Sequence, residues 1–159
     1  QNNTRWSFSA SWEDYDRDGD PDLYVANDFG RNCLYQNNNG QFSNIAKKAG
    51  VEDMAAGMSV SWGDSNRDGA PDLLIGNMFS SAGQRVSFLR DYKAGKKRMA
   101  RGNTLFTASK DGFQDASIAS GITNGGWAWS SGFADLNNDG WQDLVVANGY
   151  LTNSRDHDL

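Results

Sequence analysis

The sequence predicts an all-β protein built from small antiparallel sheets, and three observations lead to that fold class. One pattern occurs three times in the 159-residue chain. Within each copy, apolar and small polar residues alternate with a period of two, which is typical of half-buried strands rather than helices. Eighteen glycines against two prolines indicate many tight turns, and six tryptophans, five tyrosines and eight phenylalanines argue against a disordered chain.

The repeated pattern is defined by three segments that align without gaps. Each reads aromatic-x-Asp-x-(Asp/Asn)-x-Asp-Gly-x-x-Asp-Leu-x-(Val/Ile)-x-Asn, and the segments are residues 9–27, 59–77 and 130–148. A second repeated block follows the first two copies, at residues 32–51 and 103–122. Self-similarity at this spacing is the sequence signature of a repeat architecture.

Each copy is expected to contain two strands joined by an acidic loop. FSASW and MSVSW lead into the loop, and DLYVAN, DLLIGN and DLVVAN leave it with many apolar and β-branched residues. The second block adds a third strand, NCLYQ or NTLFT, and a fourth, QFSNIA or GFQDAS. The intervening turns end in Asn-Gly or Asp-Gly, pairs that favour a tight hairpin.

Four short antiparallel strands in a unit of about 50 residues are typical of a β-propeller blade. We therefore predict two blades, at about 5–51 and 56–122, and half a blade at about 126–150. About two and a half blades cannot close a ring, so we expect part of a larger propeller or completion by other copies. The insert at 79–101 holds seven of the 15 Lys and Arg residues. It is expected to be a solvated loop, with a partner or anion contact as the alternative.

Each acidic loop carries oxygen-bearing side chains at positions 1, 3, 5 and 9, counted from its first Asp, and Gly at position 6. Such side chains converge only if the backbone curls around a point, and the glycine permits that curl. Five or six oxygen ligands indicate Ca²⁺ rather than zinc or copper, with up to three ions per chain. Position 7 is expected to use only its backbone carbonyl. The predicted ligands are Asp14, Asp16, Asp18, Asp20 and Asp22; Asp64, Asn66, Asp68, Ala70 and Asp72; and Asp135, Asn137, Asp139, Trp141 and Asp143.

The acidic loops allow two other interpretations. An EF-hand needs a bidentate Glu at position 12, but that position is Val25, Ile75 or Val146 inside a strand. A solvated acidic turn without a metal is the simpler alternative, although three copies with identical spacing disfavour it. Since carboxylate number tunes calcium affinity, we predict that loop 14–22, with four ligand carboxylates, binds most tightly.

These residues resemble the FG-GAP/VCBS repeats of the integrin α-chain propeller and of many secreted bacterial proteins, and are most similar to repeats of ASPIC/UnbV-type proteins. The likeness rests on the D-x-(D/N)-x-D-G-x-x-D-L-x-V loop, then N-x-L-(Y/F) and G-x-F…A-G-(V/I). It covers the chain except the 79–101 insert and the tail after Asn148. Ala56-Gly57 stands where the family has Phe-Gly, so calcium binding is implied and integrin-like ligand binding is not.

The sequence favours an extracytoplasmic binding or scaffold module in which calcium is structural. A protein or glycan ligand is expected on one face, and self-association through exposed blade faces is a further expectation. The net charge of −5 disfavours a nucleic-acid partner. No apolar stretch approaches the roughly 20 residues that span a bilayer.

The alternative is part of a polysaccharide-acting enzyme. Trp127, Trp129 and Trp141 would then stack on sugars, whereas packing between blades is the simpler role for them. No catalytic constellation is visible, so we predict that the chain is not an enzyme. His157 lies in the polar tail and is expected to be solvated. Cys33 is expected to be a buried packing residue, because a catalytic thiol needs an activating base.

Overall fold

The computed structural model describes residues 4–79 and 99–149. These two ranges contain ten β-strands and no α-helix. None of its described helical segments is long and apolar enough to cross a membrane. The strands are β1 (Trp6–Glu13), β2 (Asp22–Asp28), β3 (Cys33–Asn38), β4 (Gln41–Asn44), β5 (Gly57–Gly63), β6 (Asp72–Asn77), β7 (Thr104–Ser109), β8 (Gly112–Asp115), β9 (Ala128–Ala134) and β10 (Asp143–Asn148).

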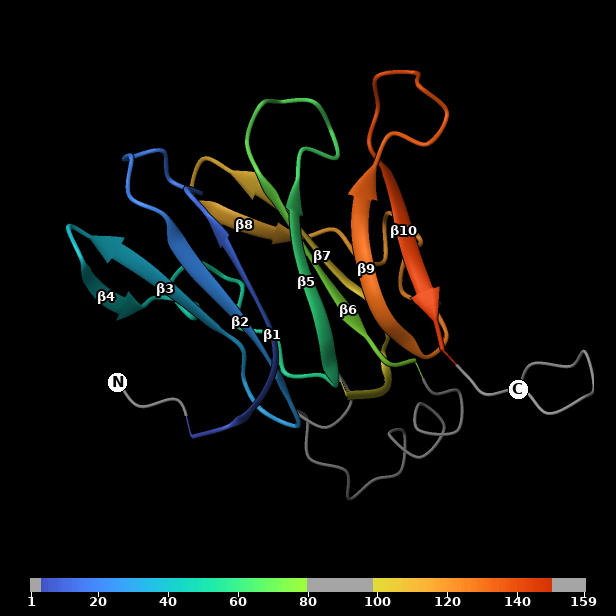
Figure 1. Ribbon diagram of the computed structural model, residues 1–159, viewed down its shortest axis with the longest axis horizontal. Helices are drawn as coiled ribbons and strands as arrows, with labels where there is room; N and C mark the ends of the chain where they lie inside the picture. The colour runs from blue at the N-terminus through green and yellow to red at the C-terminus, as the bar shows by residue number, and fades with distance from the viewer. Residues whose placement is uncertain (1–3, 80–98, 150–159) are drawn as a thin grey trace, which may run out of the picture.

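The strands form three antiparallel sheets in chain order. Strands β1 to β4 make the first sheet, β5 to β8 make the second, and β9 pairs with β10 in a third hairpin. The first strand of each sheet contacts the first strand of the next, so that β1, β5 and β9 lie side by side (Figure 1). The all-β prediction and the blade-like sheets are confirmed, and the described sheets do not close a ring.

The strand pairings repeat in detail. Each first hairpin has a register irregularity at the same place, between Ser7 and Ser9, between Gly57 and Ser59, and next to Asn148. In the first sheet the β3–β4 turn has φ of 53° at Asn39 and 85° at Gly40, the left-handed backbone that a tight hairpin turn requires. The Asn-Gly pair therefore predicted this turn correctly.

The main core lies between the first and second sheets. Tyr24, Leu34, Leu73, Ile75 and Phe106 are its largest buried members. The Tyr24 hydroxyl donates a hydrogen bond to the Val51 carbonyl at 2.8 Å, which satisfies the one polar atom of that buried ring. Large apolar side chains thus hold adjacent sheets together, as blade packing requires.

A buried polar network links the two sheets at the ends of β6 and β7. Asp53 is fully buried and accepts hydrogen bonds from Asn77 Nδ2 at 3.0 Å and from the Thr104 hydroxyl at 2.8 Å. Asn32 and Asn103 accept the backbone amides of Asn27 and Asn77 through their side-chain oxygens. The recurring asparagines of the sequence pattern are therefore structural, because they satisfy backbone groups where a strand ends.

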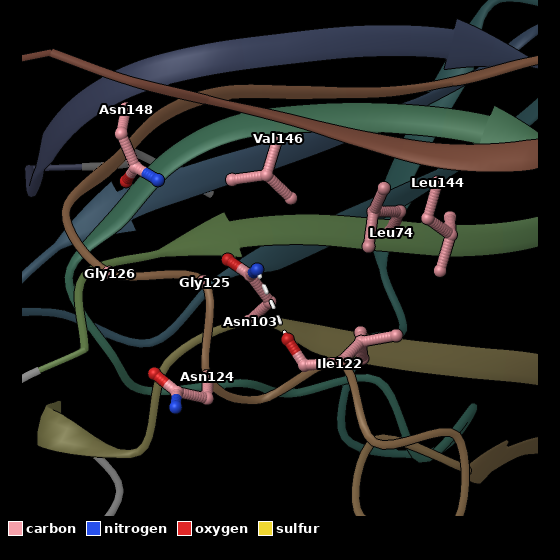
Figure 2. Close-up of a pocket in the computed structure, with 9 residues that line it drawn as sticks. All are labelled: Leu74, Asn103, Ile122, Asn124, Gly125, Gly126, Leu144, Val146 and Asn148. Atoms are coloured by element: carbon pink, nitrogen blue, oxygen red, sulfur yellow. Dashed lines mark hydrogen bonds between the residues drawn. The ribbon is translucent and has the colours of Figure 1, made fainter.

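Packing is less complete between the second sheet and the third hairpin. A cavity of about 380 Å³ separates Leu74 on β6 from Leu144 and Val146 on β10 (Figure 2). The 122–126 segment closes one side of it, where Asn103 Nδ2 donates to the Ile122 carbonyl at 3.2 Å.

Three single-residue predictions concern other parts of the chain. Cys33 is buried, as expected, and the Arg5 guanidinium donates to its sulfur at 3.1 Å. The interior of the 79–101 insert and His157 lie outside the described residues, so the predictions about them stay predictions. At the base of the insert, Phe79 and Arg101 form a β-bridge, and Arg101 also makes an ion pair with Asp115.

Candidate metal sites in the acidic loops

The three acidic loops connect the first and second strand of each sheet. They run between β1 and β2, β5 and β6, and β9 and β10, and they extend from the same end of their sheets (Figure 1). This placement agrees with the hairpin position that the sequence predicts.

The three loops share one backbone conformation. Position 6 has φ of 93°, 84° and 85° at Gly19, Gly69 and Gly140, the left-handed region where glycine carries no steric cost. Position 4 is also left-handed, with φ of 62° at Arg17 and 58° at Arg67. The sequence predicted the first of these bends, whereas Arg at position 4 gave no sign of the second.

The carboxylate at position 1 points into each loop. In the first loop, Asp14 accepts the amides of Asp18 at 3.1 Å and Gly19 at 3.0 Å. Asp64 and Asp135 accept the equivalent pairs of amides at 2.9 to 3.1 Å. Each carboxylate oxygen keeps acceptor capacity beyond one such bond, so these side chains remain able to ligate a cation.

The first loop brings three carboxylates together. Asp14, Asp16 and Asp18 each offer an oxygen, and these oxygens all lie within 4.8 Å of one another. Asp16 also accepts a hydrogen bond from Gln36 Nε2 at 2.6 Å, which orients it from β3. An acidic triad of this size fits a hard cation such as Ca²⁺.

Position 3 is an amide in the other two loops. Asn66 Nδ2 donates to Asp68 at 2.9 Å, and Asn137 Nδ2 donates to Asp139 at 2.9 Å. The hydrogen bond from the Ala70 amide, and then that from the Asn66 side chain, hold the pKa of Asp68 below its usual value. These two loops therefore present fewer carboxylates than the first, in the arrangement that the spacing predicted.

Position 9 is deeper than the other positions. Asp22 and Asp72 are fully buried, and each accepts a backbone amide from the third strand of its sheet at 2.8 Å, from Asn37 and Ala108 respectively. The closing aspartate thus joins loop to sheet, which the sequence did not reveal. Whether it also ligates a metal stays a prediction.

The second oxygen of Asp22 distinguishes the first loop. Asp22 Oδ2 is buried and makes no hydrogen bond of normal geometry, although the nearby Tyr15 amide helps to stabilise the charge. Burial, helped by Asp16 and Asp18, raises the pKa of Asp22 to about 6 against the effect of the Asn37 amide. In the other two loops, the equivalent amides of Ser65 and Leu136 donate to Asp72 and Asp143 at 3.0 Å. The weaker contact in the first loop leaves Asp22 Oδ2 only partly satisfied, and a bound cation would complete its coordination.

At position 7, the side chains of Asp20 and Trp141 make contacts outside their own loops. Asp20 accepts the backbone amide of Asn39 at 2.7 Å, in the β3–β4 turn. The Trp141 ring lies under the Arg67 guanidinium, 5.0 Å from ring centre to guanidinium carbon. The structure is therefore compatible with a ligand role for the carbonyl alone, as predicted.

Neighbouring loops contact one another, a feature that the sequence did not reveal. The Arg17 guanidinium donates to the Gly69 carbonyl, and the Asp64 amide donates to Gln142 Oε1 at 2.8 Å. With Arg67 on Trp141, these contacts link the three loops in a row. The conformation of one loop thus bears on the next.

The three tryptophans of the carbohydrate hypothesis do not form one platform. Trp141 lies in the loop at one end of the β9–β10 hairpin, whereas Trp127 and Trp129 lie at the opposite end. A strand of this length separates them by about 20 Å. Trp129 instead donates a hydrogen bond to the Gly149 carbonyl at 2.7 Å.

A family model for the FG-GAP-like repeat matches residues 14–75 and 93–146. The chain belongs to the FG-GAP-like repeat family. FG-GAP-like repeats are propeller blades, in agreement with the three antiparallel sheets. Repeats of this family are typically non-catalytic. No curated protein sequence matches the chain significantly. The likeness to VCBS repeats and to ASPIC/UnbV-type proteins stays a prediction.

Proposed function

We propose that this FG-GAP-like chain is a calcium-binding β-propeller module that acts outside the cytoplasm as a non-catalytic scaffold for a protein or glycan ligand. The observation that carries the proposal is the first loop, where the oxygens of three carboxylates lie within 4.8 Å of one another, with the buried Asp22 closing the loop. Its oxygen donors match the ligand preference of Ca²⁺.

Calcium would be held by the side chains at positions 1, 3, 5 and 9 and by the carbonyl at position 7. Ten of the 20 acidic residues occupy positions 1, 3, 5 and 9, and three bound ions would change the formal charge from −5 to +1. The ion would relieve repulsion within each loop and fix its curl. Since each loop touches the next, the ions would also stiffen the row of loops along one end of the module.

The proposed location follows from the calcium chemistry. Extracellular modules bind Ca²⁺ with dissociation constants of about 10⁻⁴ to 10⁻³ M, and loops built from exposed, hydrogen-bonded aspartates suit that range. A calcium-stiffened module outside the cell would keep its shape where calcium is abundant.

The proposal is tested by melting and titration of the decalcified protein. A ligand that binds only the folded state stabilises it by mass action, so millimolar Ca²⁺ should raise the melting temperature and a chelator should lower it. Isothermal titration should resolve up to three sites, the tightest lost in Asp14→Ala. Asp111→Ala, at an exposed turn outside the loops, is the matched control and should keep every site.

One result would contradict the proposal, and a second would contradict only the ranking of the three sites. An equal melting temperature with chelator and with calcium would show that the loops are metal-free acidic turns. Unchanged high-affinity uptake in Asp14→Ala would show that the 14–22 loop is not the tightest site, while leaving binding by the other loops intact.

A further inference from the structure

The second acidic loop, residues 64–72, contains a bend that its own residues do not favour. Arg67 at position 4 has φ of 58°, in the left-handed region that is unfavourable for a residue with a long side chain. The bend brings positions 3 and 5 together, since Asn66 Nδ2 reaches Asp68 at 2.9 Å across it. A residue keeps such a conformation only when its surroundings hold it. The contacts of Arg67 outside its own loop therefore bear on two predicted calcium ligands.

The third loop, residues 135–143, holds Arg67 through Trp141. The Arg67 guanidinium carbon lies 5.0 Å from the centre of the Trp141 ring, which is a cation–π contact. The guanidinium also passes beside Gly140, where a β-carbon would lie 3.7 Å from Arg67 Nη1. Trp141 takes position 7, where only the backbone carbonyl is a predicted ligand. Its ring is therefore free to support the neighbouring loop.

A second residue of the third loop holds the start of the second loop. Gln142 Oε1 accepts the backbone amide of Asp64, at position 1, at 2.8 Å. The contact requires Gly63, because a β-carbon there would lie 2.6 Å from Gln142 Oε1. Gln142 follows Trp141 directly. One dipeptide thus fixes positions 1 and 4 of a loop to which it contributes no ligand.

The first loop, residues 14–22, has one of these two supports. Arg17 has φ of 62° and donates a hydrogen bond to the Gly69 carbonyl of the second loop. Pro71 stands in the place of Gln142 and has no side-chain carbonyl to offer. A cleft of about 390 Å³ remains beside Pro71. The first loop therefore depends on its neighbour in the same direction, through fewer contacts.

Position 4 of the third loop supports this interpretation of the arginines. Asn138 has φ of 59°, and asparagine enters the left-handed region much more readily than arginine. Arginine occurs at position 4 in the two loops whose side chain there reaches the next loop. The contacts of Arg17 and Arg67, rather than their backbone preference, explain the presence of arginine.

We propose that Trp141 and Gln142 are positioning residues for a neighbouring calcium site, because they hold the 64–72 loop in its ligand-binding conformation without contributing a ligand to it. This inference deepens the calcium-binding function proposed above and rests on it. The calcium affinity of the second loop is then set partly by the third loop. Through Arg17, the affinity of the first loop is set partly by the second.

Calcium titration of a double variant, Trp141→Ala with Gln142→Ala, tests the proposal. The variant removes both supports and keeps the charge of Arg67 and every predicted ligand of the second loop. Asp14→Ala and Asp135→Ala are placed in the same full-length chain, so that isothermal titration reports the second loop alone. Loss of one exposed cation–π contact and one hydrogen bond should weaken this site about tenfold.

Two further variants separate positioning from a general loss of stability. Trp129→Ala removes a tryptophan that is 47 % exposed, against 49 % for Trp141, at the opposite end of the β9–β10 hairpin. It is the matched control and should keep the affinity of the second loop. Arg67→Asn gives position 4 of the second loop the residue of the third, so that the bend no longer needs the ring. In that background Trp141→Ala should change the calcium affinity by less than about twofold.

Hydrogen exchange without metal gives a second readout. The amides of Asp68 and Gly69 donate to Asp64 at 3.1 and 2.9 Å, so their exchange rates report the curl of the second loop. In chelator, the double variant should exchange both amides about tenfold faster than wild type. Trp129→Ala should exchange them at the wild-type rate.

The outcomes distinguish this inference from the calcium proposal. A wild type that takes up no calcium contradicts the calcium proposal. Calcium uptake by the second loop with the same affinity in the double variant overturns the inference alone. Unchanged exchange of the two amides in chelator overturns it as well, and so does an equal loss of affinity in Trp129→Ala.

Discussion

The two interfaces between consecutive sheets share a plan but differ in completeness. Between the first and second sheets, Tyr24 fills the space in front of Leu73 and Ile75 and hydrogen-bonds Val51. Between the second sheet and the third hairpin, Leu74 stands in the place of Tyr24 and a cavity of about 380 Å³ remains in front of Val146 (Figure 2).

The polar network differs in the same way. In the first interface, Asp53 accepts hydrogen bonds from Asn77 Nδ2 and from the hydroxyl of Thr104 on β7. In the second interface, Asn124 is the counterpart of Asp53, and it lines the open cavity together with Asn148. No described strand beside β10 supplies the counterpart of Thr104. The comparison teaches that the third strand of a blade completes the contact with the preceding blade as well as its own sheet.

The largest expected effect is the loss of the tyrosine from the complete interface. Tyr24→Ala should lower the free energy of unfolding by about 3–5 kcal/mol, because a buried aromatic ring and a hydrogen bond are removed together. Leu74→Ala should cost about 2 kcal/mol, the low end for such a truncation, because a cavity already adjoins it. Urea denaturation with an unchanged m-value measures both. A greater cost for Leu74→Ala would contradict the ranking of the interfaces.

A smaller effect is expected from the buried carboxylate. Asp53→Asn converts this site to the residue found at 124 and removes the charge that binds Asn77 and Thr104, which should cost about 1–3 kcal/mol. The reverse change in the open interface, Asn124→Asp, should stay within about 0.5 kcal/mol because that residue is exposed. Equal effects in urea denaturation would show that the network adds nothing to the first interface.

Much of this architecture was predictable from the sequence, because it depends on local rules. The period of two, the Asn-Gly turn at 39–40 and the glycine at position 6 are each decided by backbone preferences within a few residues. The alternation of carboxylates at 14, 16 and 18 likewise predicted a cluster that the structure brings together.

The features that could not be predicted from the sequence depend on contacts between segments that are distant in the chain. The bond from the Asn37 amide to Asp22 joins residues 15 apart, and the Arg17 contact with Gly69 joins residues 52 apart. The residues around Asn37 and Gly69 in the sequence carry no pattern that predicts either hydrogen bond. The tryptophans show the reverse case: proximity in sequence allowed a shared platform as the less favoured alternative, whereas the β9–β10 hairpin places Trp141 at the end opposite Trp127 and Trp129.

The third strand also determines how the first loop responds to pH. The Asn37 amide on β3 draws Asp22 into the sheet, and burial raises the pKa of this carboxyl to about 6. A folded pKa above the unfolded value favours the protonated form. Stability of the calcium-free protein should therefore fall as pH rises from about 4 to about 6, by on the order of 1–2 kcal/mol.

Urea denaturation in chelator across this pH range measures the effect. Burial also raises the pKa of Asp28, which contributes with the same sign, so the slope lost in Asp22→Asn isolates Asp22. The pKa of Asp115 is lowered, because hydrogen bonds from Ser117 and Arg101 outweigh the effect of burial. Asp115 therefore changes the free energy of unfolding only at lower pH. A slope that is identical in Asp22→Asn and wild type would contradict the assignment.

The smallest expected effect is a gain, from rebuilding the complete interface in the incomplete one. Leu74→Tyr gives β6 the residue that β2 has at Tyr24, and its hydroxyl would reach toward the Ile122 carbonyl, the counterpart of the Val51 carbonyl. Filling the cavity and adding this hydrogen bond should stabilise the protein by about 1 kcal/mol and raise the melting temperature by about 2–4 °C. Leu74→Phe fills the same space without the hydroxyl, so it should give a smaller rise. Destabilisation by both variants would show that the second interface is closed by different packing from the first.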